Sequence, residues 1–226
     1  MDQMIKKAMT FALFGLLLTA LPAAAGVEAY EALGIDKGKV ISGTQASAQV
    51  LPGEEKQLVC LVAYFSGKGK NATVKLRLGV LQGNEKSYTI AWEQDFSSKY
   101  DDGKVGEGNL ELLDLDRDGQ AEIIVTFDLF SDPLIRQRFG EVIVWDEGQF
   151  KTAWSGPFEY DATKAVRDVP VERRDHFVRE LDLINTLRTR GVTLFFNKTM
   201  IAVAGERLVE PKVVEETFPL RKRLNF

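Results

Sequence analysis

In the sequence Leu113-Asp114-Leu115-Asp116-Arg117-Asp118-Gly119-Gln120-Ala121-Glu122-Ile123-Ile124-Val125, an acidic turn runs directly into a β-branched segment. Oxygen-donor side chains occupy alternate positions of the turn: Asp114, Asp116, Asp118, Gln120 and Glu122. Hard cations such as Ca²⁺ take six to eight oxygen ligands at about 2.3–2.6 Å. These five residues are therefore the candidate ligands of one structural Ca²⁺ ion. The alternative is an acidic turn that is exposed to solvent and binds no metal.

The turn is not an EF-hand loop, although the spacing D-x-D-x-D-G is shared with that motif. An EF-hand requires a bidentate Glu at position twelve, which here is Val125. The residues after the turn, Ile123 to Phe127, are β-branched and aromatic and predict a strand rather than a helix. Glu122, at position nine, takes the place of the missing ligand. The motif is therefore predicted to be a calcium loop that leads into a β-strand.

This run of about a dozen residues resembles the calcium-loop core of FG-GAP and VCBS-type repeats, which build β-propeller blades in exported bacterial proteins and in integrin-like heads. The resemblance implies that side-chain oxygens come from Asp114, Asp116, Asp118 and Glu122, that Gln120 contributes its backbone carbonyl, and that Gly119 permits the turn. The chain departs from the family pattern elsewhere. The Phe-Gly pair of the family precedes the loop, whereas Phe139-Gly140 follows it here.

Two diverged copies of one β-meander are predicted from internal similarity at an offset of 62 residues. Trp92 corresponds to Trp154, inside a shared aromatic-x-x-x-Trp-x-x-x-Phe frame. The copies span about 45–100 and 108–160 within a β-repeat domain of residues 26–160, and chance similarity between β-rich segments is the alternative. Since a propeller typically needs four or more blades, two copies predict a partial propeller-like body or a sandwich.

The pattern changes in residues 161–226, which we expect to pack on the repeats. Phe177, Leu181, Ile184 and Leu187 follow one another at helical spacing, between Pro170 and Gly191. They predict one amphipathic helix of about 20 residues. A terminal hairpin is predicted from Val192 to Val203 around Asn197-Lys198, and Val213 to Phe218 predict a last strand. The fold class is thus mainly β, with one C-terminal helix.

Residues 1–25 have the pattern of a secretory signal. Lys6 and Lys7 precede an apolar run from Phe11 to Leu21, and Ala23-Ala24-Ala25 forms a small-residue cleavage site. The run is shorter than the roughly 20 residues of a transmembrane helix. We therefore expect a periplasmic or extracellular protein with no stable membrane insertion after cleavage; a retained N-terminal anchor is the alternative.

Composition and motifs exclude several classes of function. The net charge is −4 for the whole chain, and loss of Lys6, Lys7 and Asp2 makes it −5, so no basic face for nucleic acid is expected. The single cysteine, Cys60, lies in an apolar run and is expected to fill a core. The single histidine, His176, has no motif around it that would mark a catalytic base. No catalytic residue is therefore assigned.

These features together predict an exported, non-catalytic, calcium-binding β-repeat protein. Its expected role is that of a binding or structural module of the cell envelope, and its expected partner is a protein or a cell-envelope polymer. The alternative is an exported hydrolase for glycan or ester bonds in which Ca²⁺ supports the active-site loops. That alternative requires a deep pocket that holds either a pair of carboxylates, whose separation only the fold can determine, or a serine with a base.

Overall fold

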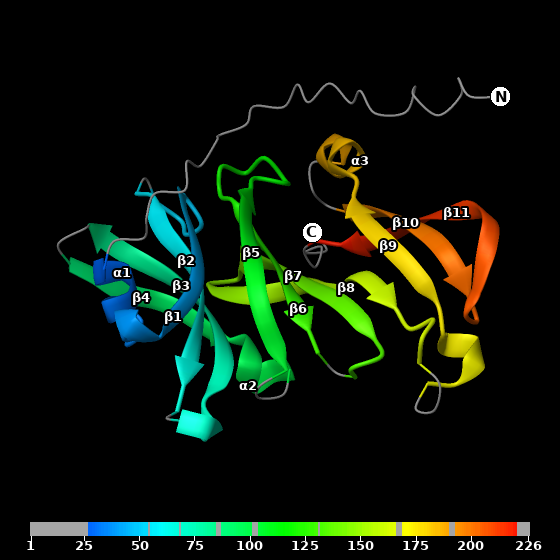
Figure 1. Cartoon of the computed structure of the whole chain (residues 1–226). Helices are drawn as coiled ribbons and strands as arrows, with labels where there is room; N and C mark the ends of the chain where they lie inside the picture. The colour runs from blue at the N-terminus through cyan, green and yellow to red at the C-terminus, as the bar shows by residue number, and fades with distance from the viewer. Residues whose placement is uncertain are drawn as a thin grey trace, which may run out of the picture.

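The computed structural model describes residues 27–220 apart from 54, 68, 85–86, 101–103, 131, 166–168 and 190–192. It contains two antiparallel sheets (Figure 1). The first has the order β1–β2–β3–β4, with strands Val40–Ala48, Gln57–Ser66, Thr73–Asn84 and Ser87–Asp95. The second has the order β11–β10–β9–β8–β7–β6–β5; in chain order its strands are Val105–Leu113 (β5), Glu122–Leu129 (β6), Arg136–Asp146 (β7), Gln149–Asp161 (β8), His176–Leu181 (β9), Thr193–Val203 (β10) and Glu206–Pro219 (β11). The expected mainly β fold is confirmed.

Helical segments in the described residues are short. The α-helices are α1 (Val27–Ala32), α2 (Phe96–Tyr100) and α3 (Leu183–Arg188), and the 3₁₀ turns are Lys37–Lys39, Gly69–Asn71 and Val171–Arg173. None of the described helices is both long and apolar enough to cross a membrane. The predicted secretory segment, residues 1–25, lies outside the described residues.

The first core lies between the four-stranded sheet and one face of β5–β7. From the first sheet it receives inward-facing residues of β2 and β3, including Leu61 and Leu78. From the second sheet it receives alternate residues of β6, namely Ile123, Val125 and Phe127. Because side chains alternate along a strand, this arrangement buries one face of each sheet in a sandwich.

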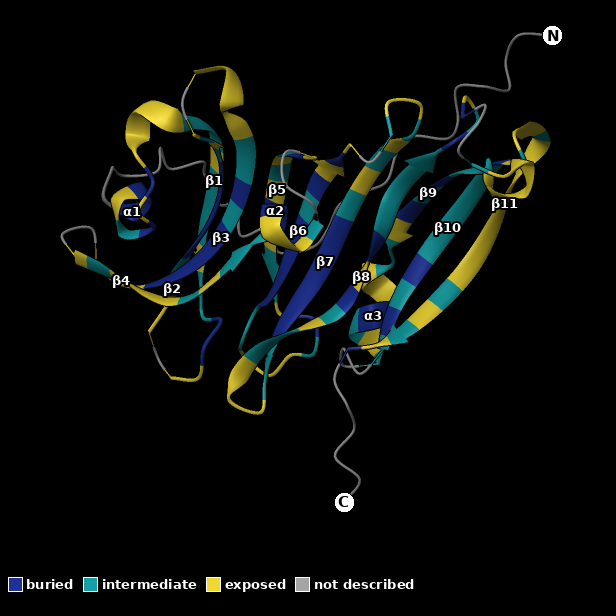
Figure 2. Cartoon of the chain, turned by 90° about the horizontal axis from the view of Figure 1, so that it is seen from below, coloured by how far each residue is buried: buried dark blue, intermediate teal, exposed yellow. Residues whose placement is uncertain are grey.

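The second core lies on the opposite face of β6, β7 and β8, where the seven-stranded sheet curls so that β10 approaches it. Ile124 and Val142 contact this core from the central strands, and Leu194 and Phe196 enter it from β10. Trp154 stacks on Phe196 at a centroid distance of 4.5 Å. In Figure 2 the buried colour accordingly runs along the middle of both sheets, while β11 at the outer edge is largely exposed. The two cores make the central strands hydrophobic on both faces.

The β3–β4 and β7–β8 hairpins have the same register at the 62-residue offset. Val80 lies opposite Trp92, and Val142 lies opposite Trp154. A register shift follows at the corresponding place in each hairpin, directly after Val80 and directly after Val142. Two copies of one meander would have tryptophans and register shifts at equivalent positions. The position of a bulge is a specific feature of a hairpin, because a bulge changes the direction of its side chains.

The predicted helix of about 20 residues is wrong. Residues His176–Leu181 form strand β9, and among the described residues of this segment the α-helix is confined to Leu183–Arg188. The cause is Arg179, which is 8% exposed on the inward face of β9. Its guanidinium lies 5.2 Å from the centroid of Phe177 and forms an ion pair of 2.8 Å with Glu216. A buried arginine hides the two-residue alternation of a strand, and the remaining apolar positions then match a helical spacing.

The terminal hairpin is present, but its turn is not at Asn197-Lys198. Strand β10 continues through both residues, and the chain turns at Ala204-Gly205, where φ is 52° and 82°. Two consecutive positive φ values fit a tight hairpin turn, for which glycine is favoured. Lys198 stays in the strand because its ammonium lies 4.2 Å from the Phe177 ring centroid and 3.5 Å from Glu216.

A third apolar cluster places α1 against the outer face of the first sheet, over Cys60. Ala29, Tyr30 and Leu33 cover the thiol, which is fully buried. Burial raises the pKa of Cys60 from 9.0 to about 12. The thiol is therefore a core residue, as the sequence predicts.

We expect Cys60 to react with DTNB only after unfolding. Burial keeps the reagent from the thiol, and the raised pKa keeps the thiol from ionising to the reactive thiolate. The folded pKa lies above the unfolded one, so the stability contributed by the neutral thiol is complete below pH 9. It is lost between pH 9 and 12, at about 1.4 kcal/mol per pH unit. Equilibrium unfolding at alkaline pH measures this slope, and Cys60→Ala should remove the contribution of the thiol while leaving that of Tyr100, whose pKa is also raised. Rapid labelling of the folded protein would contradict the burial of the thiol.

Candidate metal site

The acidic turn connects β5 to β6 and is held by contacts on both sides. Leu115 is fully buried in the second core. The amide of Ala121 donates a hydrogen bond of 2.7 Å to the carbonyl of Gln49, in the β1–β2 connection. The turn is therefore anchored near both ends, at Leu115 and at Ala121, while Asp114 and residues 117–119 are exposed to solvent.

Backbone amides organise the turn around its aspartates. The amides of Asp118 and Gly119 donate hydrogen bonds to the Asp114 carboxylate, each at 3.1 Å. Arg117 and Gly119 have positive φ values of 61° and 90°. The left-handed conformation at Gly119 explains why glycine occupies this position, since other residues adopt it at a cost.

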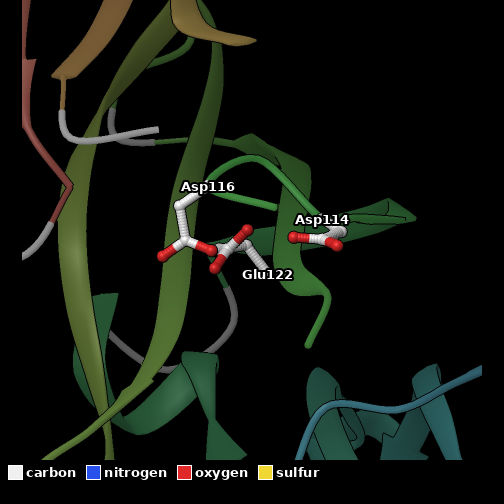
Figure 3. A group of neighbouring side chains, drawn as sticks. All are labelled: Asp114, Asp116 and Glu122. Atoms are coloured by element: carbon white, nitrogen blue, oxygen red, sulfur yellow. The ribbon is translucent and has the colours of Figure 1, made fainter. Parts of the chain in front are cut away.

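Three of the five predicted ligands converge. Carboxylate oxygens of Asp114, Asp116 and Glu122 lie within 4.8 Å of one another. Figure 3 shows the three side chains directed toward a common region. Oxygens around one Ca²⁺ ion at about 2.3–2.6 Å can be separated by at most about 4.6–5.2 Å, which is twice that radius. The three carboxylates thus fit a single hard cation.

Glu122 is the most buried member of the group, at 1% exposure. One of its oxygens, Oε2, accepts a hydrogen bond of 2.6 Å from the amide of Leu115. Burying a carboxylate is costly unless it is hydrogen-bonded and its charge is compensated. Two further carboxylates beside it increase the electrostatic cost, and a divalent cation would offset it.

The other two predicted ligands have different surroundings. Asp118 lies outside the converging group, and its Oδ1 accepts a hydrogen bond of 2.8 Å from the amide of Gln120. The side-chain carbonyl oxygen Oε1 of Gln120 is buried and accepts no hydrogen bond within the described chain. A bound cation or water molecule would supply the partner that such an oxygen normally has. The sequence motif gives only the spacing of the oxygen-donor residues. It therefore cannot show which side chains converge and which hydrogen-bond within the turn.

A shallow groove of about 370 Å³ lies on the concave face of the curled sheet, beside the turn. Its apolar lining comes from Leu113, Ile124, Phe158, Leu181 and Leu183, and its polar lining from Asn109, Glu111, Thr126, Arg138, Arg179 and Glu180. The hydrolase alternative would use the carboxylates Glu111 and Glu180. Both are exposed to solvent, whereas the general acid of a glycosidase is held protonated by burial. Neither of these two carboxylates has the buried setting of such a general acid.

A second polar cluster, which the sequence analysis missed, surrounds Glu141 on β7. Its side chain is fully buried. It accepts hydrogen bonds from Tyr100, from Gln94 at 3.2 Å and from Thr152 at 3.0 Å, and Lys99 forms an ion pair of 2.8 Å with it. Burial, and then the hydrogen bond to Glu141, raises the pKa of the Tyr100 hydroxyl. Its donors come from residues more than 40 positions away as well as from the adjacent strand, so no local motif marks it.

His176 lies on β9 and not on a helix. Its Nδ1 is 3.9 Å from Asp161 Oδ2. Partial burial opposes ionisation of Asp161, but hydrogen bonds from Thr163 and the nearby His176 outweigh it and lower the pKa of that carboxyl. The histidine is thus a partner of the Asp161 carboxylate at the end of β8.

No family model, no curated protein sequence and no solved structure matches this chain.

Proposed function

We propose that this protein is an exported, non-catalytic calcium-binding β-repeat module of the cell envelope. The convergence of Asp114, Asp116 and Glu122 carries the proposal. The three carboxylates supply hard oxygen donors, which Ca²⁺ prefers, and the resemblance of the loop to FG-GAP and VCBS-type repeats supports the same ion. The signal-like residues 1–25 support a periplasmic or extracellular location, which fractionation of cells that express the full chain would check.

The ion would act on structure and not on a reaction. It would neutralise three neighbouring carboxylates and hold the β5–β6 turn in the conformation in which Leu115 reaches the second core. The same turn contacts the β1–β2 connection through Ala121 and Gln49. Calcium would thereby stabilise the contact between the two sheets.

The binding role would use the groove on the concave face. Its lining includes both signs of charge, with Arg138 and Arg179 as cations and Glu111 and Glu180 as carboxylates. Such a surface suits a protein segment or a cell-envelope polymer that has both apolar and charged groups. Because Leu113 both lines the groove and precedes Asp114, calcium binding would also order one wall of the groove.

Calcium is expected to raise the melting temperature of the purified mature protein by about 5–10 °C at a hundredfold excess over its Kd. This estimate combines about 2.7 kcal/mol of linkage with about 2–4 °C per kcal/mol for a chain of this size. Thermal melts in calcium and in EDTA measure the shift, and calorimetric titration measures the Kd.

Matched variants make the calcium test specific. Asp116→Asn should abolish most of the shift, because it removes a charged ligand from the converging group. Glu111→Gln removes an exposed carboxylate on the adjacent strand and should leave the shift intact. Identical melting temperatures in calcium and in EDTA for the unaltered protein would refute the metal proposal.

A further inference from the structure

Strand β11 forms an open end of the seven-stranded sheet. Among the described strands it pairs only with β10, whereas β5 at the other end packs against β1, β2 and β3 of the first sheet. Three of its valines are exposed: Val209 at 102%, Val213 at 61% and Val214 at 37%. Figure 2 shows exposed residues along most of its length. An exposed strand edge with apolar side chains is a template for pairing with another chain.

The middle of β11 is also detached from β10. Lys212 is paired with Met200 and Arg207 with Ala202, so residues 208–211 lie opposite Ile201 alone. The extra residues bulge out of the ladder, and the Pro211 among them has no amide hydrogen to donate. The ladder with β10 is therefore interrupted here, and a partner strand must have a residue opposite Pro211 that needs no hydrogen bond from its amide.

The stretch from Arg207 to Glu215 is complementary to itself in antiparallel orientation. With a two-fold axis through Pro211, every facing pair is either oppositely charged or apolar: Glu210–Lys212, Val209–Val213, Leu208–Val214 and Arg207–Glu215. Facing pairs of these types stabilise antiparallel strands, and like charges destabilise them. The next pair outward would be Glu206 with Glu216, but Glu216 is already paired with Arg179 at 2.8 Å.

We propose that a second copy of this chain binds here, with β11 pairing antiparallel to β11 of the other copy around an axis at Pro211. Such an isologous contact uses one surface twice, so each complementary pair occurs twice in the dimer. The proline defines the register, because facing prolines can occupy only a pair that exchanges no backbone hydrogen bonds. Lys212 and Glu210 then form the adjacent hydrogen-bonded pairs.

The dimer should be weak, because pairing of nine-residue strands buries an area at the low end of specific interfaces, below about 1,200 Å². We expect a Kd of about 10–100 μM in low salt, measured by sedimentation velocity over a concentration series. A chain that sediments as a monomer up to about 200 μM would overturn the proposal.

A charge exchange tests the register directly. Glu210→Lys places two lysines opposite each other at two places in the dimer, and Lys212→Glu places two glutamates there. Each single variant is expected to raise the Kd at least about tenfold. The double variant Glu210→Lys with Lys212→Glu restores opposite charges and should return the Kd to that of the unaltered chain. Dimerisation that is indifferent to the single changes, or a double variant that remains monomeric, would exclude this register.

A disulfide on the axis provides a second test. In Pro211→Cys the two new cysteines would face each other at about 4.5 Å between Cα atoms, within the range that disulfides span. Mild oxidation should give a covalent dimer, since Cys60 is buried and takes no part. Ile184→Cys, at a position 66% exposed on α3, is the control and should cross-link far more slowly. Equal rates for the two variants would count against the axis.

Discussion

Replacing Glu141 by alanine is expected to lower the free energy of unfolding by about 3–5 kcal/mol. This carboxylate is fully buried and accepts hydrogen bonds from Tyr100, Gln94 and Thr152. Its removal leaves the partly buried donors of Tyr100 and Gln94 without an acceptor and empties a fully buried site, and both losses destabilise the fold. Lys99 contributes less, because its side chain is 40% exposed and can turn to water. Denaturation by guanidinium chloride measures the loss.

A surface ion pair on the same strands provides the control. Glu159→Ala breaks the pair with Arg136, whose side chain is 80% exposed, and should cost less than about 1 kcal/mol. A double-mutant cycle of Glu141→Gln with Tyr100→Phe should show a coupling of at least about 0.5 kcal/mol, because the two side chains are directly hydrogen-bonded. If Glu141→Ala were as stable as Glu159→Ala, the buried Glu141 cluster would not contribute to the stability of the fold.

Replacing Leu115 by alanine is expected to cost about 2–5 kcal/mol, measured by the same denaturation in EDTA. Leu115 is fully buried in the second core, and its truncation leaves a cavity there. Because Leu115 lies between Asp114 and Asp116, loss of its anchor should also weaken calcium binding several-fold in calorimetric titration.

The control for Leu115 is Leu134→Ala, in the connection between β6 and β7. Leu134 is 47% exposed, and its truncation should change the stability by less than about 0.5 kcal/mol. The two measurements separate packing from metal binding. A Leu115→Ala chain with unaltered stability in EDTA would show that the turn is not anchored in the core.

Local patterns predicted the elements whose residues interact mainly with near neighbours. At the β7–β8 hairpin, Glu147 and Gly148 adopt positive φ values of 51° and 81°, a conformation that a glycine in a short turn favours. The strand after the acidic turn is likewise present, as β6. Its alternate residues serve two cores, which explains why Ile123 to Phe127 has almost no polar position.

Local patterns failed where a polar side chain is buried by partners that are distant in sequence. Arg179 is buried by Glu216, by the Trp154 ring and by the carbonyl of Pro157, and without those partners the segment looks helical. Glu141 is buried by Tyr100 and Lys99, more than 40 residues earlier. Burial of a charge depends on what the fold brings to it, and hydropathy along the chain cannot represent that.

The sequence by itself determined the class of the fold and the location of the acidic turn, because strand alternation, turn residues and ligand spacing are properties of short segments. Only the tertiary structure decided which carboxylates converge. The converging carboxylates are those of Asp114, Asp116 and Glu122. They converge because Leu115 packs in the second core and Ala121 hydrogen-bonds to the β1–β2 connection. Asp118 instead accepts a hydrogen bond within the turn. Convergence is a matter of distances in space, and these are set by packing between segments that are far apart in the chain.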